Sequence, residues 1–584
     1  MHKTSSPYLK ELFKGSIKWM PFNIRTLNFA QKTDRIIYIH IGYIGNIAER
    51  EKAYNLFRDE RVVNIINENF IPIAIDMEDV PEAMLVGMDL LVISEQTYTI
   101  PINIFSLPGA KPFTSFSNTS PEEFLNLANN IIYSFKEKRD LLNKAGKYIA
   151  TRLKGTGIVT KKEKPYPIAD KLLHAYVRSW TTRYIASRKR ERISPYTINS
   201  RYYVFLLKYS NFYQKSEELE FLQNALDKVY YSAIFDPIEG GLFSQATNTT
   251  FSEPLYEKQL SENIQAAVLY SFGYKYFKNA IYKRASIEII EFIESVFKSV
   301  KGGYATSMTL SCNVSSSSYY RYSLKEIYST FANDGKRIAQ ALGMDPNLDK
   351  EAQQIIHNTP QFRTLTLEER EILKKIRRGK AKETIRDNRI ITAYNCMYAT
   401  SLCIIANNIK EKKTEYLAAA ERIIEHILQH QKEDKIKLYR YISTNKNEHQ
   451  SAQLLDYTFF LNALLNIYKH TKKSTYEKLI SKYTAYILLN YYQSHNGMFS
   501  KTPRSEDITP FKRESVIDYV RYSANSVMAR NLWILYKMQK DEFYLEAFKQ
   551  QLYNVAPHMI GSGPLMVGWA LQILNYLSDK SDYD

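Results

Sequence analysis

Cysteine is nearly absent from this chain of 584 residues, and its scarcity excludes several classes of protein. The three cysteines, Cys312, Cys396 and Cys403, are an odd number and lack the spacing of a metal site. A scaffold held together by disulfide bonds is therefore excluded, and a reducing compartment is expected. The start of the sequence also lacks the apolar stretch of a secretory signal peptide. We therefore predict a cytoplasmic protein.

Several other signals of function are missing. No apolar run reaches the roughly 18 residues of a membrane-spanning helix, so we predict a protein that does not span a membrane. There is no phosphate-binding glycine loop, no nucleophile elbow and no helix-turn-helix, RNP-type or zinc pattern. His426 and His430 stand four residues apart without a third ligand, so we expect an exposed helix pair. No metal, no cofactor and no specific nucleic-acid site is predicted.

Aromatic residues and basic charge are what the sequence has in abundance. It contains 46 Tyr and 28 Phe, and its net charge is +18. Residues 1–150 are neutral, with 17 basic and 17 acidic residues, whereas the remainder has 62 basic and 44 acidic residues. The excess is densest in residues 152–201. Such a stretch is either a solvated helix face and linker or a docking surface for an acidic partner.

The first 150 residues alternate between strand and helix patterns. Apolar runs at residues 35–41, 70–76, 101–105 and 112–116 predict strands, and helical patterns at residues 49–57 and 60–69 lie between the first two. Ser120-Pro-Glu-Glu opens a further helix, with Ser120 at the N-cap and acids in the first turn. Strand, helix, strand, two strands and helix is the order of a thioredoxin-like fold. We place this domain at residues 1–150 and a basic linker at residues 151–166.

From residue 167 to residue 584 the pattern becomes almost wholly helical. Long helical segments run from residues 169–185 to residues 566–576, and glycine-bearing loops separate several of them, as at Gly240, Gly302 and Gly497. Helix pairs that recur every 50–70 residues or so are typical of repeat architectures. An α/α-toroid of six helical hairpins explains the pattern best, and an open α-solenoid is the alternative. The fold class is therefore an α/β domain followed by an (α/α)6 toroid.

The motifs resemble those of the spermatogenesis-associated protein 20 family over nearly the whole chain. In the first domain they are Ser6-Pro-Tyr-Leu9, Trp19-Met-Pro-Phe22, Ile41-Gly-Tyr43, Asn67-Glu-Asn-Phe70, Ile75-Asp76 and Pro101-Ile-Asn-Ile-Phe105. The family's two redox cysteines fall on Asn46 and Glu49, and Pro101 matches the proline that faces the redox corner. Thiol–disulfide exchange needs a thiolate and a resolving thiol, so the resemblance implies a redox-inactive corner.

The same resemblance extends through the helical domain, where the family is similar to six-hairpin glycosidases and sugar 2-epimerases. The echoed motifs are Gly240-Gly-Leu-Phe243, Tyr256-Glu-Lys-Gln-Leu-Ser-Glu-Asn263, Arg386-Asp-Asn-Arg-Ile-Ile-Thr-Ala-Tyr-Asn395, Leu455-Asp-Tyr-Thr458 and Ser523-Ala-Asn-Ser526. They imply Glu257, Asp387 and Asp456 as candidate catalytic carboxylates. The other implied barrel positions are Glu262, Asn263, Asn395, Asp518 and Asn525. Each carboxylate is alternatively a helix cap or a loop-fixing group.

Two functions remain open at this point. The family's acidic loop is replaced by residues 307–319, which hold no carboxylate, and the histidine before the Phe-Glu-Lys motif is replaced by Leu255. Loss at both expected chemical centres favours a protein that acts by binding a protein, peptide or glycan partner. The alternative is a carbohydrate-directed enzyme, a glycoside hydrolase or sugar epimerase, that uses the barrel carboxylates. Two carboxylates that converge on a cavity would favour the enzyme.

Overall fold

The chain divides into two units, each with its own core. The computed structural model describes residues 4–45, 47–96, 100–155, 159–187, 196–300, 302–311, 318–360, 365–431, 436–442, 450–503, 514–518 and 521–581. Met1–Ile158 form the first unit, and Val159–Ser505 with Glu514–Asp584 form the second. The division lies within the predicted linker at residues 151–166, but that linker starts inside a helix, because α7 continues to Gly155.

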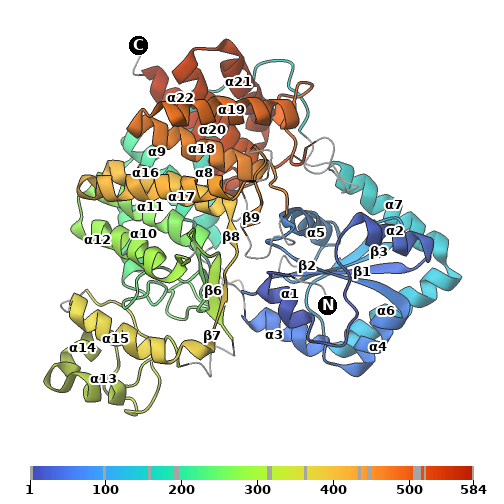
Figure 1. Ribbon diagram of the computed structural model, residues 1–584, viewed down its shortest axis with the longest axis horizontal. Helices are drawn as coiled ribbons and strands as arrows, with labels where there is room; N and C mark the ends of the chain where they lie inside the picture. The colour runs from blue at the N-terminus through green and yellow to red at the C-terminus, as the bar shows by residue number, and fades with distance from the viewer. Residues whose placement is uncertain are drawn as a thin grey trace. The chain divides into compact units, whose positions relative to one another are not determined.

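A mixed four-stranded sheet forms the centre of the first unit (Figure 1). Its strands are β1 (Ile36–Gly42), β2 (Phe70–Asp76), β3 (Ile102–Leu107) and β4 (Lys111–Phe116), in the order β2-β1-β3-β4. β1 and β2 pair in parallel, whereas β3 runs antiparallel to both β1 and β4. β1, β2 and β3 are almost entirely buried, which explains why they are continuous apolar runs rather than alternating ones.

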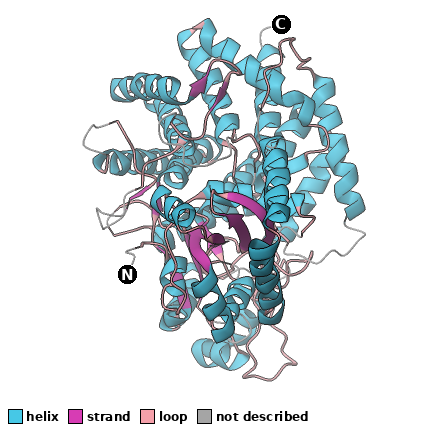
Figure 2. Ribbon diagram, turned by 90° about the vertical axis from the view of Figure 1, so that its right-hand side faces the viewer, coloured by secondary structure: helices cyan, strands magenta, loops and turns pink. Residues whose placement is uncertain are grey.

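Helices cover the sheet of the first unit, as Figure 2 shows. They are α1 (Pro7–Leu12), α2 (Ile24–Lys32), α3 (Ile47–Leu56), α4 (Glu60–Asn69), α5 (Pro81–Ile93), α6 (Pro121–Glu137) and α7 (Arg139–Gly155). α4 packs on β2 and α6, whereas α5 and α7 pack on each other and on β3 and β4. Ser120 begins α6 with a capping box to Glu123, as its sequence predicts. The unit has the predicted thioredoxin-like fold.

Six of the described helices form the inner ring of the second unit. They are α9 (Ser200–Phe212), α11 (Leu260–Phe277), α16 (Thr392–Asn408), α18 (Leu454–Thr471), α20 (Ala524–Gln539) and α22 (Val567–Ser581). Each packs on the next, and α22 packs on both α20 and α9. This last contact closes the ring, so the second unit is the predicted toroid and not an open solenoid.

An outer layer of helices completes the hairpins. It contains α8 (Asp170–Ser187), α10 (Ser216–Tyr230), α12 (Ala280–Phe292), α17 (Lys413–Gln429), α19 (Ser474–Tyr491) and α21 (Glu542–Val555). The inner helices are buried almost all round, as in α16, whereas outer helices such as α17 bury one stripe. No helix in the described part of the chain is both long and apolar enough to cross a membrane.

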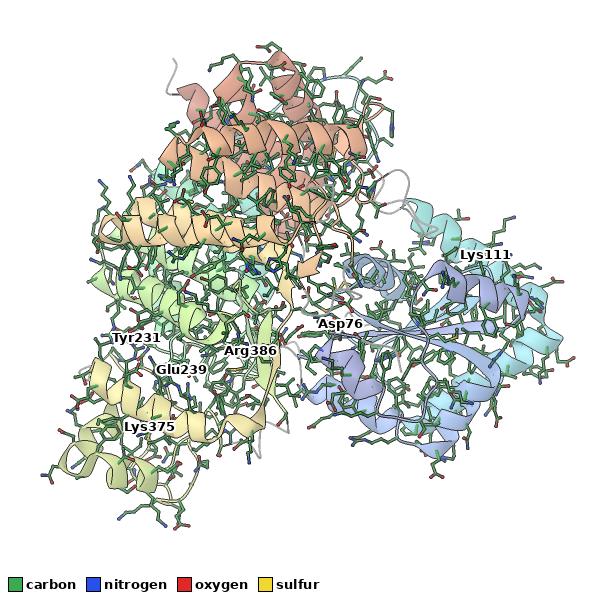
Figure 3. All side chains as sticks on the ribbon, viewed as in Figure 1. Asp76, Lys111, Tyr231, Glu239, Lys375 and Arg386 are labelled. Atoms are coloured by element: carbon green, nitrogen blue, oxygen red, sulfur yellow. The ribbon has the colours of Figure 1, made fainter. Side chains whose placement is uncertain are left out.

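An insertion between α12 and α16 was not predicted from the sequence. It contains α13 (Leu324–Phe331), α14 (Gly335–Ala341) and α15 (Leu367–Gly379), packed around a buried apolar cluster of their own. From α15, Arg377 reaches back to Asp236 at 2.6 Å and to Glu239 at 3.2 Å, and Glu239 is labelled in Figure 3. Lys258 pairs with the same Asp236 at 2.6 Å. These buried ion pairs fix the insertion to the loop between α10 and α11 that carries Asp236 and Glu239.

Short strands connect the helices at the loops of the ring. They are β5 (Lys258–Gln259), β6 (Ser307–Leu310), β7 (Thr384–Asp387), β8 (Ile390–Ile391), β9 (Tyr441–Ile442), β10 (Tyr492–Gln493) and β11 (Met498–Phe499). β6 pairs antiparallel with both β5 and β7. The two-residue strand β5 directly precedes α11, so this small sheet positions the side chains that begin that inner helix.

Candidate functional site

The redox corner of the first unit carries a carboxylate where a thiol is expected. Asn46 lies outside the described residues. Glu49 is in the first turn of α3, where its carboxylate accepts hydrogen bonds from Lys52 Nζ at 2.9 Å and from Asn118 Nδ2 at 2.6 Å. Pro101 follows a cis peptide bond and lines the same corner as Glu49. No cysteine occurs in Met1–Ile158, so this unit has no thiol of its own for disulfide exchange.

Tyr8, His40 and Asn103 form a buried chain of hydrogen bonds next to that corner. Asn103 Nδ2 donates to the Ser117 carbonyl at 2.9 Å, so its Oδ1 faces His40 Nδ1 at 2.7 Å and accepts from it. The other ring nitrogen of His40 accepts from the Tyr8 hydroxyl at 2.6 Å. Burial lowers the pKa of His40 to about 4, so the ring is neutral near pH 7.

The space left at the corner is small. A cavity of about 10 Å³ lies between Tyr8, Glu49 and Pro101, which is room for about one water molecule. A Cβ atom at Gly42 would overlap the Tyr8 ring, so the tyrosine and the glycine fit together closely. Peptide binding at this corner stays a prediction.

Three predicted barrel residues are loop clamps on the inner helices. Asn263 of α11 binds the backbone N–H and C=O of Leu242 at 2.7 and 3.0 Å. Asn395 of α16 binds those of Tyr304 at 2.8 and 3.1 Å, and Asn525 of α20 binds those of Phe499 at 2.8 and 3.1 Å. All three asparagines are buried. The repeated motif therefore holds each glycine-bearing loop onto the next inner helix of the ring.

The structure gives Asp387 and Asp456 structural partners. Asp387 accepts from Arg389 Nε at 2.9 Å and from Arg389 Nη2 at 2.5 Å, and it is 1% exposed. Asp456 is fully buried, where it accepts from Arg440 at 3.1 Å and caps backbone N–H groups at the start of α18 and α16. Neither residue lines the cavities that Arg201 lines in the described part of the ring. Carboxylates that are satisfied in this way position loops.

Glu262, by contrast, lines a polar cavity together with Arg201 of α9. The cavity has a volume of about 240 Å³, and Asn199, Gln245 and Gln265 also line it. Burial, helped by the nearby Glu257 carboxylate, raises the pKa of Glu262 to about 7, although the Ser244 hydroxyl and Arg201 oppose the shift. Two of the predicted carboxylates, Glu257 and Glu262, are thus brought together, and Glu262 lines the cavity.

Asp518 supports the other side of Arg201. Its carboxylate accepts from the backbone N–H of Ser523 at 2.6 Å and from that of Gly568 at 2.5 Å, so it joins the starts of α20 and α22. The negative charge of Asp518 opposes the lowering of the Arg201 pKa that burial causes. The Tyr522 ring lies 5.5 Å from the Arg201 guanidinium, within reach of a cation–π contact. Asp518 therefore favours the charged form of Arg201.

Arg201 was not predicted from the sequence as a site residue, and neither was a site at the axis of the ring. The predicted basic stretch of residues 152–201 ends at Arg201, which is 5% exposed and lies inside the ring rather than on a solvated face. Of the two basic runs in that stretch, residues 161–164 are described and Lys161 and Lys164 are exposed, whereas residues 188–192 lie outside the described residues. A docking role for them stays a prediction. The signal that locates Arg201 is its place in the first turn of α9, two residues after the N-cap Asn199.

We predicted that His426 and His430 are an exposed pair on a helix, and this prediction is wrong for His426. This residue is 9% exposed, and a Cβ atom at Gly302 would overlap its ring. Burial lowers the pKa of His426 to about 4, and His430 Nδ1 lies 2.8 Å from the His426 carbonyl oxygen. The residues that the structure describes contain no cluster of three or more His, Cys, Asp or Glu placed to hold a metal.

Comparisons with known proteins agree with the sequence motifs. Residues 1–154 match a family model described as "Protein of unknown function, DUF255". An uncharacterized protein of Caenorhabditis elegans is 22% identical over 93% of this chain and 81% of its own length. Spermatogenesis-associated protein 20 of Mus musculus is 19% identical over 94% of this chain and 78% of its own length. The resemblance to the spermatogenesis-associated protein 20 family is confirmed.

The solved structures to which this chain is similar include a sugar epimerase and a mannanase. A cellobiose 2-epimerase from Bacillus thermoamylovorans has a TM-score of 0.45 and 10% identity, covering 70% of this chain and 100% of its own. A glycoside hydrolase family 76 α-mannanase of Bacteroides thetaiotaomicron has a TM-score of 0.42 and 13% identity, covering 70% of this chain and 97% of its own.

Proposed function

We propose that the second unit binds a carbohydrate at the Glu262 cavity and acts on it by proton transfer. The observation that carries this proposal is the place of Glu262 in a polar cavity that Arg201 also lines, where burial raises the pKa of its carboxyl group to about 7. Such a carboxyl group is present in both protonation states near neutral pH, so it can give or take a proton during a reaction. The amides of Gln245 and Gln265 offer hydrogen-bond donors and acceptors to the hydroxyl groups of a sugar.

The neighbours of Glu262 have complementary roles in this proposal. Glu257 is 2% exposed and is held by Gln259 Nε2 at 2.9 Å, and its charge favours the protonated form of Glu262. Arg201 lines the same cavity, where its guanidinium can stabilise negative charge that develops on a substrate oxygen. Asp387 and Asp456 have no part in the chemistry, because both are committed to buried arginines.

The pH dependence of turnover distinguishes the two reactions that this site can support. If protonated Glu262 donates to a glycosidic oxygen, activity falls as pH rises through about 7. If ionised Glu262 removes a proton next to a sugar carbonyl, activity falls as pH drops through about 7. The first profile belongs to a hydrolase and the second to an epimerase or isomerase.

The experiment uses the full chain with two substrate sets. Reducing monosaccharides are incubated in D₂O and followed by NMR for exchange of the proton at C2, and a panel of glycosides is followed for release of reducing ends. We expect one of the two reactions, reduced about 10²–10⁴-fold in Glu262→Gln. The exposed Glu477 on α19 supplies the control, because Glu477→Gln leaves the cavity unchanged. Equal turnover by wild type and Glu262→Gln would refute the proposal.

We propose further that the first unit is redox-inactive and contributes by binding or by structure. Glu49 is held by Lys52 and Asn118, and the unit contains no cysteine. Reduction of a protein disulfide by the full chain, in the presence of dithiothreitol, is expected to be no faster than with dithiothreitol alone. Faster reduction would contradict this assignment.

A further inference from the structure

A second cavity lies along the axis of the ring. It has a volume of about 140 Å³, and side chains from α9, α11, α16, α18, α20 and α22 line it. Arg201 and Gln265 line this axial cavity and also the Glu262 cavity, so the two spaces meet at these side chains. A ligand that contacts Glu262 with one end can therefore place its other end inside the ring.

Positive charge is concentrated in the axial cavity. Arg201, Lys208 and Arg530 line it, and no Asp or Glu is among the described residues that line it. Asp518 and Glu262 compensate Arg201, whereas Lys208 donates to the neutral Asn575 Oδ1 at 3.2 Å. Burial lowers the pKa of Arg530, and the Tyr522 hydroxyl opposes that shift. Cations in an enclosed site of low dielectric attract an anion strongly.

Thr400 of α16 supplies an independent observation. It is 6% exposed, lines the axial cavity, and its buried hydroxyl has no hydrogen-bond partner in the described structure. A buried polar group without a partner costs about 1–3 kcal/mol, so such groups often mark a site that a ligand completes. A hydroxyl group on a residue that lines the same cavity as Lys208 and Arg530 offers one more donor to an oxyanion.

We propose that the axial cavity binds the phosphoryl group of the ligand, which makes the ligand a sugar phosphate. Lys208, Arg530 and Thr400 provide three donors for the three free oxygens of a phosphate monoester, whereas a carboxylate has only two oxygens. The sugar part of this assignment rests on the proposed function of the Glu262 cavity. The phosphoryl part depends on the axial cavity alone and can be tested alone.

Protonation of Lys208 gives the site a pH dependence. Burial lowers the pKa of Lys208 to about 8. The charged groups that act on it come from several helices, with Arg530, Lys275 and Lys469 lowering the pKa and Asp579 raising it. An anion binds the protonated form better, so affinity falls as pH rises through about 8. Ionisation of Glu262 near pH 7 acts in the same direction through Arg201, so it needs a separate control.

The first test is titration calorimetry of the full chain with inorganic phosphate. We expect binding to wild type that weakens at least tenfold in both Lys208→Met and Arg530→Met. The exposed Lys478 on α19 provides the control Lys478→Met, which should bind like wild type. Thr400→Val, which keeps the side-chain shape, is expected to weaken binding by a few-fold and covers the case in which a charge variant does not fold. Unchanged affinity in folded Lys208→Met and Thr400→Val would overturn the proposal.

The second test measures pH dependence with sulfate, whose charge does not change between pH 6 and 9. Affinity is expected to fall above pH 8 in wild type and in Glu262→Gln, but to stay level in Lys208→Arg. A merely structural lysine would give the same profile in all three proteins. A fall that persists unchanged in Lys208→Arg would therefore overturn the role of Lys208.

A third comparison separates this inference from the proposed function. Glucose 6-phosphate should bind more tightly than glucose or glucuronate in wild type, and Lys208→Met should remove that preference. If glucuronate binds more tightly than the phosphate ester, the phosphoryl assignment is wrong. If inorganic phosphate binds through Lys208 while no sugar binds or reacts, the proposed function fails and the phosphoryl site stands.

Discussion

Glu262 and Lys208 are titratable side chains whose burial moves their pKa values toward neutrality from opposite directions. The pKa of Glu262 is raised to about 7, and that of Lys208 is lowered to about 8. Burial penalises the charged form in both cases. Both residues therefore reduce the stability of the folded ring when they are charged, which is common where a site is built for a ligand rather than for stability.

The stability that the folded ring loses when Glu262 ionises predicts how the stability of the second unit depends on pH. Its folded-state pKa lies above the usual 4.5, so the unfolded state ionises first and stability is lost as pH rises from about 4.5 through 7. Glu262→Gln removes this loss. We expect the variant to be about 3 kcal/mol more stable than wild type at pH 8 and to differ little at pH 4.5. Differential scanning calorimetry of the full chain at the two pH values checks this.

The exposed Glu477→Gln variant is the control for that measurement and should follow wild type at both pH values. A Glu262→Gln variant that is less stable than wild type at pH 8 would show that Glu262 is ionised and well compensated in the fold, contrary to its assigned role.

Among the elements, the inner helices depend on their asparagine clamps. Asn395 satisfies both backbone groups of Tyr304, and no apolar side chain can do so. We predict that Asn395→Leu destabilises the second unit by about 2–4 kcal/mol, because a buried N–H and C=O lose their partners. The exposed Asn347→Leu should have an effect within about 0.5 kcal/mol. Chemical denaturation followed by far-UV circular dichroism measures both, and similar stability of the two variants would contradict the clamp.

The sequence predicted most of the elements but not all of them. The strands of the first unit and most hairpins of the ring follow from their apolar periodicity. α9 was missed because Tyr202, Tyr203, Val204 and Phe205 are residues typical of a strand, and only the closed ring makes them helical. α5 was missed because it is apolar on nearly every side and has no clear helical stripe.

The candidate site was predictable only in part. Glu257 and Glu262 belong to one motif, so the resemblance located them. Arg201, Lys208 and Arg530 come from α9 and α20, which are more than 300 residues apart in sequence and meet only through the ring. No local pattern marks such a set. The same motif reasoning selected Asp387 and Asp456, because a carboxylate that fixes a loop recurs as regularly as one that reacts.

At the scale of the whole molecule, the two cores predict two unfolding transitions. The pKa of His40 in the folded first unit is about 4, below its usual 6.5, so this unit loses stability as pH falls from about 6.5 to 4. Acid should therefore lower the transition temperature of the first unit, and His40→Leu should remove that slope while lowering stability at pH 7. Calorimetry between pH 7 and 4 tests this.

The assignment of the two transitions has its own check. Asn395→Leu should lower the transition temperature of the second unit only, and His40→Leu that of the first unit only, since the two residues lie in different units. If both variants move the same transition, the units do not unfold independently and the prediction fails.

The closing contact of α22 with α9 has a consequence for biosynthesis. The axial cavity needs Leu571, Gln572 and Asn575 as part of its wall, and these residues are translated long after Arg201. At ordinary translation rates of about 5–20 residues per second, the early helices wait roughly 20–70 s for that wall. The nascent chain thus carries aromatic and charged ring helices without their final neighbour, and chaperones have their longest opportunity to act in that interval. A message cut short before α22 would yield a chain without the axial site.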